Sequence, residues 1–167
     1  AYALSEQFDT PVMLRLSTRI AHSRSIVDTT DREDVPLKPY EKNVAKNVMM
    51  PGNAIRRHPI VEQRTRDLIA YAESAPVNRV EMGDTKLGII TSSTSYQYAK
   101  EVFGDQASIL KLGMIYPLPE QLILDFASKV DRLVVIEELD AVIEEHCRQL
   151  GLEVSGKDIL PLEGEYS

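Results

Sequence analysis

The sequence predicts an α/β fold, in which a flavodoxin-like parallel sheet carries helices on both faces. Short apolar strands alternate with helices through the second half of the chain, and the strands are apolar without interruption, as in parallel sheets covered on both sides. Right-handed crossovers then predict about four parallel strands. The strands are expected at 87–91, 108–112, 132–136 and 158–162, and the helices at 95–103, 119–129 and 140–150.

Two local elements are expected near the start of the chain. Residues 1–8 predict a short helical piece, and Val12–Leu16 predicts an apolar strand that runs into a polar turn. The sheet neighbours of such a strand are expected in another part of a longer polypeptide. The lack of an initiator Met agrees with that expectation, so the sequence is interpreted as a piece of a larger enzyme.

The middle of the chain predicts a linker followed by one long helix. Residues 26–52 are polar and broken by Pro36, Pro39 and Pro51, which favours an irregular connection. From about 55 to 73, apolar residues recur at helical spacing, and Ala75–Pro76 ends the helix. His58 precedes Pro59 and is expected in a loop or at the helix start. Gly104 and Gly151 are expected to end two later helices, and Pro119 to begin one.

Composition narrows the class of function. The net charge of −7 argues against nucleic acid as the main partner. A single cysteine excludes an internal disulfide framework and a multi-cysteine metal or iron–sulfur site within these residues, and it agrees with a cytoplasmic location. No apolar run approaches the length of a membrane span, so no membrane contact is expected.

Ser92–Ser95 is a candidate anion site, because it follows an expected strand and begins an expected helix, where backbone N–H groups attract anions. The alternative is ordinary helix capping by Thr94 or Ser95. The absence of glycine weighs against a phosphate loop.

Glu137 and Glu138 follow the strand at 132–136 and are candidates for a domain interface. They are adjacent on a strand and therefore point in opposite directions, which argues against an acid–base pair. The alternative is capping of the next helix together with Asp140. On that helix, Cys147 is expected on the apolar face beside Val142, Ile143 and Leu150, and His146 beside it is poorly placed to form a nucleophile pair.

The turn after Val12–Leu16 carries Arg19, His22, Ser23 and Arg24. Two guanidinium groups and an imidazole are suited to bind a carboxylate or phosphate, and an imidazole also transfers protons near neutral pH. These residues are the candidates for substrate binding. The alternative is a set of ordinary surface or interface contacts.

Three passages resemble the alpha subunit of indolepyruvate ferredoxin oxidoreductase, a thiamine-diphosphate-dependent family of 2-oxoacid:ferredoxin oxidoreductases. They are PVMLRLSTRIAHSRS, KLGIITSSTSYQYAKE, and the stretch from ILKLGMIYPLPEQ through RLVVIEELDAVIEEHCRQLG with its tail GKDILPLEGEYS. The LKLGM-x-YPLP and VVIEEL motifs are the more specific parts. Members of the family often carry glycine where Ser93 stands, which puts a ligand contact at this position in doubt.

The resemblance implies three parts. Residues 1–25 are expected to end a pyrimidine-binding domain, residues 26–52 to form a linker, and residues 53–167 to form a transketolase C-terminal-like domain. The parent enzyme is expected to decarboxylate aryl 2-oxoacids oxidatively, with coenzyme A taking the acyl group and ferredoxin the electrons. Its thiamine diphosphate, Mg²⁺ and [4Fe-4S] clusters are expected outside these residues, which implies a structural, domain-contact role without catalysis by the piece alone.

The partners implied by the resemblance are the remaining domains of the alpha subunit, a beta subunit, ferredoxin and coenzyme A. Two other interpretations remain open at this point. One is a free-standing flavodoxin-like module that holds an anion or nucleotide at Ser92–Ser95. The other is the matching domain of a different thiamine enzyme, such as a transketolase.

Overall fold

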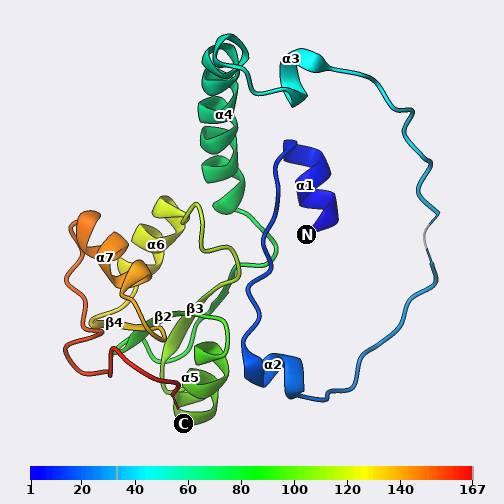
Figure 1. The fold of residues 1–167 in the computed structure, drawn as a ribbon. Helices are drawn as coiled ribbons and strands as arrows, with labels where there is room; N and C mark the ends of the chain where they lie inside the picture. Colours follow the sequence, from blue (N-terminus) through cyan, green and yellow to red (C-terminus); the bar gives the residue numbers. More distant parts are fainter. Residues whose placement is uncertain (33, 167) are drawn as a thin grey trace. The chain divides into compact units, whose positions relative to one another are not determined.

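The computed structural model describes residues 1–32 and 34–166. The chain divides into two compact units, Ala1–Arg64 and Thr65–Ser167. The first unit contains three short helices and most of a long one, and the second contains the sheet (Figure 1). The predicted division of the chain into a domain remnant (1–25), a linker (26–52) and a second domain (53–167) remains a prediction.

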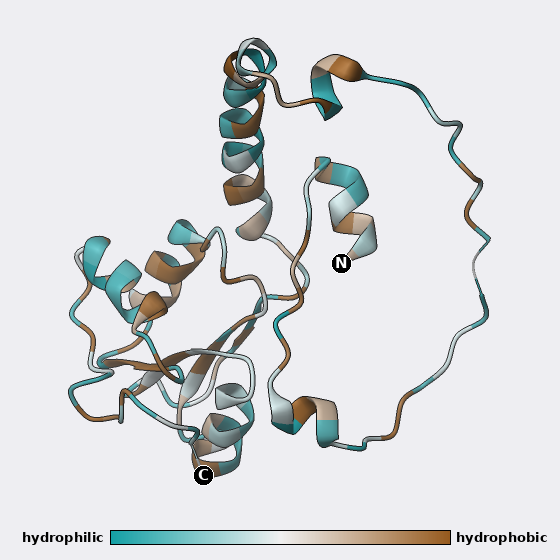
Figure 2. Cartoon of the chain, viewed as in Figure 1, coloured by the Kyte–Doolittle hydropathy of each residue, from teal (hydrophilic) through white to brown (hydrophobic). Residues whose placement is uncertain are grey.

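The first unit is built from helices joined by extended chain. Its helices are α1 (Tyr2–Phe8), α2 (Thr18–His22), α3 (Val44–Asn47) and the start of α4 (Pro51–Ala72). Apolar and polar residues alternate around α4 (Figure 2), and Pro59 lies inside it. His58 therefore lies inside the helix, and not in a loop or at the helix start as predicted. Its Nε2 lies 3.5 Å from Glu62 Oε1 one turn later.

The predicted strand at Val12–Leu16 is wrong. Residues 11–17 have no regular secondary structure, and Met13 and Leu14 are 90% and 71% exposed. A strand needs a neighbouring strand to pair its backbone groups, and the described part of the first unit offers none. The helical piece predicted just before it is confirmed as α1.

The second unit is a mixed sheet in the order β1-β3-β2-β4. Three parallel strands form its main part: β2 (Gly88–Ser92) pairs with both β3 (Ser108–Leu112) and β4 (Leu133–Ile136), as predicted. The edge strand β1 (Arg79–Glu81) runs antiparallel to β3 and was missed. The strand expected at 158–162 is also wrong, since these residues form mostly turns and bends, and the chain pairs with β4 only earlier, through a single bridge between Val134 and Ser155.

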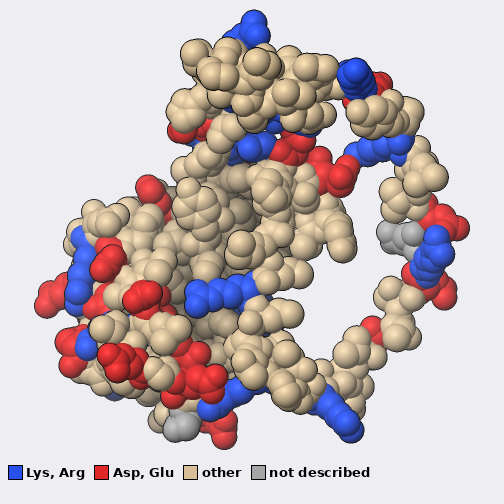
Figure 3. Space-filling view, viewed as in Figure 1, with Lys and Arg blue, Asp and Glu red and all other residues tan. Residues whose placement is uncertain are grey.

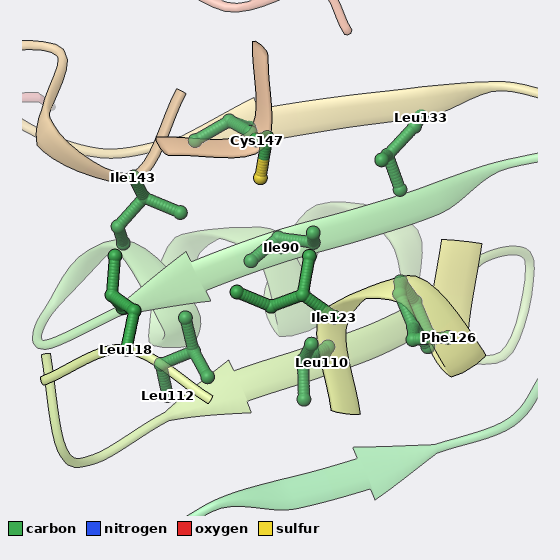
Figure 4. Close-up of a cluster of buried hydrophobic side chains, with 10 residues drawn as sticks. Ile90, Leu110, Leu112, Leu118, Ile123, Phe126, Leu133, Ile143 and Cys147 are labelled. Atoms are coloured by element: carbon green, nitrogen blue, oxygen red, sulfur yellow. The ribbon is translucent and has the colours of Figure 1, made fainter. Parts of the chain in front are cut away.

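Helices cover both faces of this sheet, which confirms the predicted α/β class (Figure 1). One core cluster joins the strands to α6 (Glu120–Ala127) and α7 (Val142–Gln149) through Ile123, Phe126, Ile143 and Cys147 (Figure 4). The other joins the opposite face to α5 (Ser95–Phe103) through Tyr96 and Ala99. Neighbouring strand residues such as Ile89 and Ile90 belong to different clusters, because successive side chains point to opposite faces.

The helix ends follow the expected signals in part. Gly104 caps α5 with a φ of 53°, and Gly151 follows α7 with a φ of 81°. Pro119 is the N-cap of α6 rather than its first helical residue. The peptide bond between Tyr116 and Pro117, in the YPLP motif, is cis.

Candidate functional site

Glu137 lies at the carboxyl end of β4 and is buried. Its carboxylate accepts two backbone hydrogen bonds from the first turn of α7, Ile143 N to Oε2 and Glu144 N to Oε1, both at 2.9 Å. Burial raises the pKa of the Glu137 carboxyl, and the two N–H donors counteract part of that rise. Glu137 therefore caps α7, which agrees with the helix-capping interpretation of the sequence. It does so from six and seven residues before the N–H groups that it binds, and without Asp140.

A second buried carboxylate, Glu144, lies in the first turn of α7. Its Oε2 accepts the backbone N–H of Lys157 at 2.8 Å, and its Oε1 lies 2.5 Å from a guanidinium nitrogen of Arg148. A Cβ added at Gly156 would lie 2.3 Å from the Glu144 carboxylate, so the chain approaches this group through a glycine. Glu144 thus connects α7 to the C-terminal segment.

Glu138 follows Glu137 beyond the end of β4, so neither residue lies on the strand, and the prediction that they point in opposite directions stays a prediction. Glu138 Oε1 accepts the backbone N–H of Tyr166 at 3.0 Å. Acidic side chains gather over the part of the second unit that contains β4, α7 and the C-terminal segment (Figure 3). A domain-interface role for Glu137 and Glu138 remains a prediction, while the structure gives each an internal partner.

Cys147 is fully buried in the core cluster, which confirms its expected structural role. Burial raises the pKa of its thiol to about 12, and the neighbouring Glu137 and Glu144 carboxylates add to the rise. The thiol therefore stays protonated at neutral pH and is a poor nucleophile. Val142, expected on the same apolar face, is instead 54% exposed.

Ser92–Ser95 occupies the predicted place between β2 and α5. Ser93 has a φ of 52°, the left-handed conformation that glycine adopts without strain. Thr94 is the N-cap of α5, one of the two positions predicted, but it makes no side-chain capping bond. The neighbouring Thr91 is buried and donates its hydroxyl to the Ile136 carbonyl at 2.8 Å, which ties β2 to β4.

The predicted substrate turn forms α2 and its end. Arg19 and His22 lie in the last turn of α2, where positive charge complements the helix dipole, and Ser23 is the C-cap. The Ser23 hydroxyl donates to the Ile20 carbonyl at 2.9 Å. Arg19, His22, Ser23 and Arg24 are all exposed. Spacing of three residues places Arg19 and His22 on one side of the helix, so the turn presents a basic surface.

Two sets of contacts that hold the second unit together are not indicated by any pattern in the sequence. Glu73, just beyond α4, accepts the backbone N–H groups of Gln121 at 3.0 Å and Leu122 at 2.7 Å, and so caps α6. Lys157 and Tyr166 hold the C-terminal segment against Glu137. Both depend on residues far apart in the chain, which no local pattern indicates.

Within the described residues, no group of three or more His, Cys, Asp or Glu side chains is arranged to hold a metal ion. None of the helices in the described part of the chain is both long enough and apolar enough to span a membrane.

Comparison with known proteins gives no matching protein-family model. The chain is 33% identical, over 99% of its length, to indolepyruvate oxidoreductase subunit IorA of Archaeoglobus fulgidus, of which it covers 28%. The family resemblance predicted from the sequence is confirmed. The chain is also 36% identical, over 86% of its length, to IorA of Methanothermobacter marburgensis, of which it covers 24%.

The chain thus spans about a quarter of the length of these IorA relatives, which is consistent with the predicted piece of a longer subunit. It is also 29% identical, over 96% of its length, to 2-oxoglutarate synthase subunit KorA of Archaeoglobus fulgidus, of which it covers 53%. Among solved structures, a 2-oxoglutarate:ferredoxin oxidoreductase from Magnetococcus marinus matches 64% of the chain with a TM-score of 0.48 and 15% identity.

Proposed function

We propose that this chain is a section of the alpha subunit of an indolepyruvate-type 2-oxoacid:ferredoxin oxidoreductase and that it contributes structure rather than reacting groups. The observation that carries the proposal is the match to IorA, which extends over 99% of the chain but only 28% of the relative. A match of this kind assigns the chain to one region of a longer enzyme.

The chemistry at the carboxyl edge of the sheet supports the structural role. The Glu137 carboxylate binds two N–H groups of α7, and Glu144 binds Lys157 N and Arg148. The Cys147 thiol, with a pKa of about 12, stays protonated. The groups at this edge that most resemble acid, base or nucleophile are therefore engaged in holding the fold together.

In this proposal the complete enzyme decarboxylates aryl 2-oxoacids oxidatively, transfers the acyl group to coenzyme A and passes electrons to ferredoxin. Thiamine diphosphate, Mg²⁺ and [4Fe-4S] clusters are held by parts of the enzyme other than these 167 residues, and a beta subunit is a partner of the alpha subunit. A cytoplasmic location belongs to the same proposal and rests on the single-cysteine composition. The likeness to KorA makes 2-oxoglutarate the competing substrate.

The test is the activity of the complete enzyme complex that contains this sequence. With coenzyme A present, we expect reduction of ferredoxin or a viologen dye to depend on indolepyruvate, and the 167-residue chain alone to reduce nothing. A preference for 2-oxoglutarate would move the substrate assignment to the KorA type. Activity with no 2-oxoacid, or turnover by the isolated chain, would contradict the proposal.

Within this proposal, the basic turn at Arg19, His22, Ser23 and Arg24 lies near the active cleft and steadies the substrate carboxylate. In the complete enzyme, Arg19→Ala and His22→Ala are expected to raise KM for the 2-oxoacid or lower kcat. Arg32→Ala is the matched control, because Arg32 is an exposed arginine paired with Asp34 outside the turn. Unchanged kinetics in both variants would remove the turn from the site.

A further inference from the structure

Residues 157–166, named here the C-terminal strap, return to the carboxyl end of β4 after the bridge between Ser155 and Val134. At its far end, Tyr166 donates its hydroxyl to the Glu137 carbonyl at 2.6 Å and its backbone N–H to Glu138 Oε1 at 3.0 Å. The last described residue of the strap is thus bound to two successive residues at the end of a core strand.

The other end of the strap is held at the same point. Lys157 Nζ donates to the Glu137 carbonyl, to the Tyr166 hydroxyl at 3.0 Å and to the Pro161 carbonyl at 3.3 Å. The ammonium also lies 5.4 Å from the centre of the Tyr166 ring. The Glu137 carbonyl therefore accepts from both ends of the strap, and Lys157 and Tyr166 close it into a loop.

The middle of the strap is more exposed than its ends. Ile159 and Leu162 are 56% and 55% exposed, and the strap adds no strand to the sheet. The hydrogen bonds that hold the strap at the end of β4 involve the side chains of three residues, Lys157, Tyr166 and Glu138. Segments held by few contacts and exposed to water open at lower free energy than a packed core does.

The strap also forms one wall of a largely apolar cavity of about 360 Å³. Leu160, Pro161 and Tyr166 line it from the strap, and Val102, Phe103 and Ile136 line it from α5 and β4. Val102 is already 70% exposed, but opening of the strap would remove this wall and expose the half-buried Phe103 of α5 and Ile136 of β4 further to water. That exposure is unfavourable, so the closed state has a second source of stability besides the hydrogen bonds.

We propose that the C-terminal strap opens and closes as one unit while the sheet stays folded, and that the shared bond of Lys157 and Tyr166 to the Glu137 carbonyl controls this opening. The strap is then a conformational device that covers and uncovers the half-buried apolar side chains of Phe103 and Ile136. The inference rests on contacts within the second unit and is independent of the enzyme proposed above.

Hydrogen exchange of the full chain, followed by mass spectrometry, tests the proposal. In Tyr166→Phe the ring remains and only the hydroxyl bond is lost, so we expect peptides covering the strap to exchange roughly fivefold faster, with the β2, β3 and β4 peptides unchanged. Tyr116→Phe is the matched control, because it removes the hydroxyl of an 82% exposed tyrosine outside the strap. We expect no change in that variant.

Lys157→Met removes the second donor and is expected to accelerate strap exchange at least as much, whereas Lys129→Met, at an exposed lysine, leaves it unchanged. In the unaltered protein, strap exchange should not respond to low urea concentrations, because local opening exposes little surface. Strap exchange that is unchanged in both variants would overturn the proposal. So would strap and sheet exchange that rise together, or strap exchange that follows urea as the sheet does.

Discussion

Ser93, in the turn between β2 and α5, has a backbone conformation that glycine adopts more easily than serine. Its φ of 52° lies in the left-handed region, which costs a residue with a Cβ roughly 1 kcal/mol relative to glycine. The turn between β2 and α5 therefore favours glycine at this position for a conformational reason, which requires no ligand.

Replacement of Ser93 by glycine should therefore stabilise the chain by about 1 kcal/mol. The measurement is urea unfolding followed by circular dichroism. Ser92→Gly is the control, since Ser92 lies in β2 and glycine inside a strand is destabilising. A Ser93→Gly variant that is less stable than the original would show that the serine side chain contributes more than the backbone strain costs.

Glu137→Ala removes the acceptor for two N–H groups of α7 and should lower the free energy of unfolding by about 2 kcal/mol at neutral pH. Because burial raises the pKa of Glu137 in the folded state, protonation favours folding, and its contribution is lost as the pH rises through the folded pKa. The loss caused by Glu137→Ala should therefore be larger at pH 5 than at pH 7.

Unfolding curves at these two pH values give the comparison. Glu163→Ala, at an exposed glutamate of the C-terminal strap, is the control and should change stability little. A loss that becomes smaller on acidification would mean that the N–H donors, and not burial, determine the pKa of Glu137.

At the scale of elements, two helices of the second unit begin on carboxylates from elsewhere in the chain. Glu73 caps α6 by accepting two N–H groups that lie 48 and 49 residues later in the chain. Glu137 caps α7 across the loop between β4 and α7. Negative charge at a helix N-terminus satisfies free N–H groups and complements the dipole. These caps fix the helices on the strands and explain why the acidic residues of this edge are structural.

In the first unit, one acidic residue joins three elements. Asp9, the C-cap of α1, accepts from Lys46 of α3 at 2.5 Å and from Arg57 of α4 at 2.9 Å, and its carbonyl accepts from Arg64. The hydrogen bonds from Lys46 and then Arg57 lower the pKa of the Asp9 carboxyl. The attachment of α1 therefore depends on an ionised Asp9.

Asp9→Asn should increase hydrogen exchange in α1 relative to the unaltered chain, because the ionic partner of Lys46 and Arg57 is lost. Since the folded pKa lies below the ordinary value of 3.8, the attachment is present above that pH and is lost as the pH falls through the folded value. Asp28→Asn, at an exposed aspartate of the same unit, is the control. Equal exchange in α1 for both variants would remove Asp9 from this role.

At the scale of the whole molecule, the buried residues are concentrated in one unit. Among the residues that the structure describes, every buried one lies at Ala72 or later, and both core clusters belong to the sheet and its helices. Cooperative unfolding reflects the loss of such a core. The first unit therefore contributes little of the burial that stabilises the fold.

A shortened chain that begins at Pro51 should consequently keep cooperative thermal unfolding, with a Tm within about 5 °C of that of the full chain. A chain that ends at Val154 is the comparison, because it loses the Ser155 bridge and the bond from Lys157 to Glu144. We expect a clearly larger fall in Tm for that chain, measured by circular dichroism. Loss of cooperativity on removal of residues 1–50 would contradict this view of the core.

The sequence by itself determined the three parallel strands, the helices between them, the core position of Cys147 and the family resemblance. These follow from local signals, because an uninterrupted apolar run, helical spacing and a capping glycine each act within a few residues. Only the tertiary structure decided that Val12–Leu16 is unpaired, that β1 is antiparallel, and that Glu73 and Lys157 hold distant segments. Strand pairing and buried carboxylate contacts depend on which groups from distant parts of the chain meet. A short stretch of sequence does not contain both partners, so it cannot indicate the interaction energy between them.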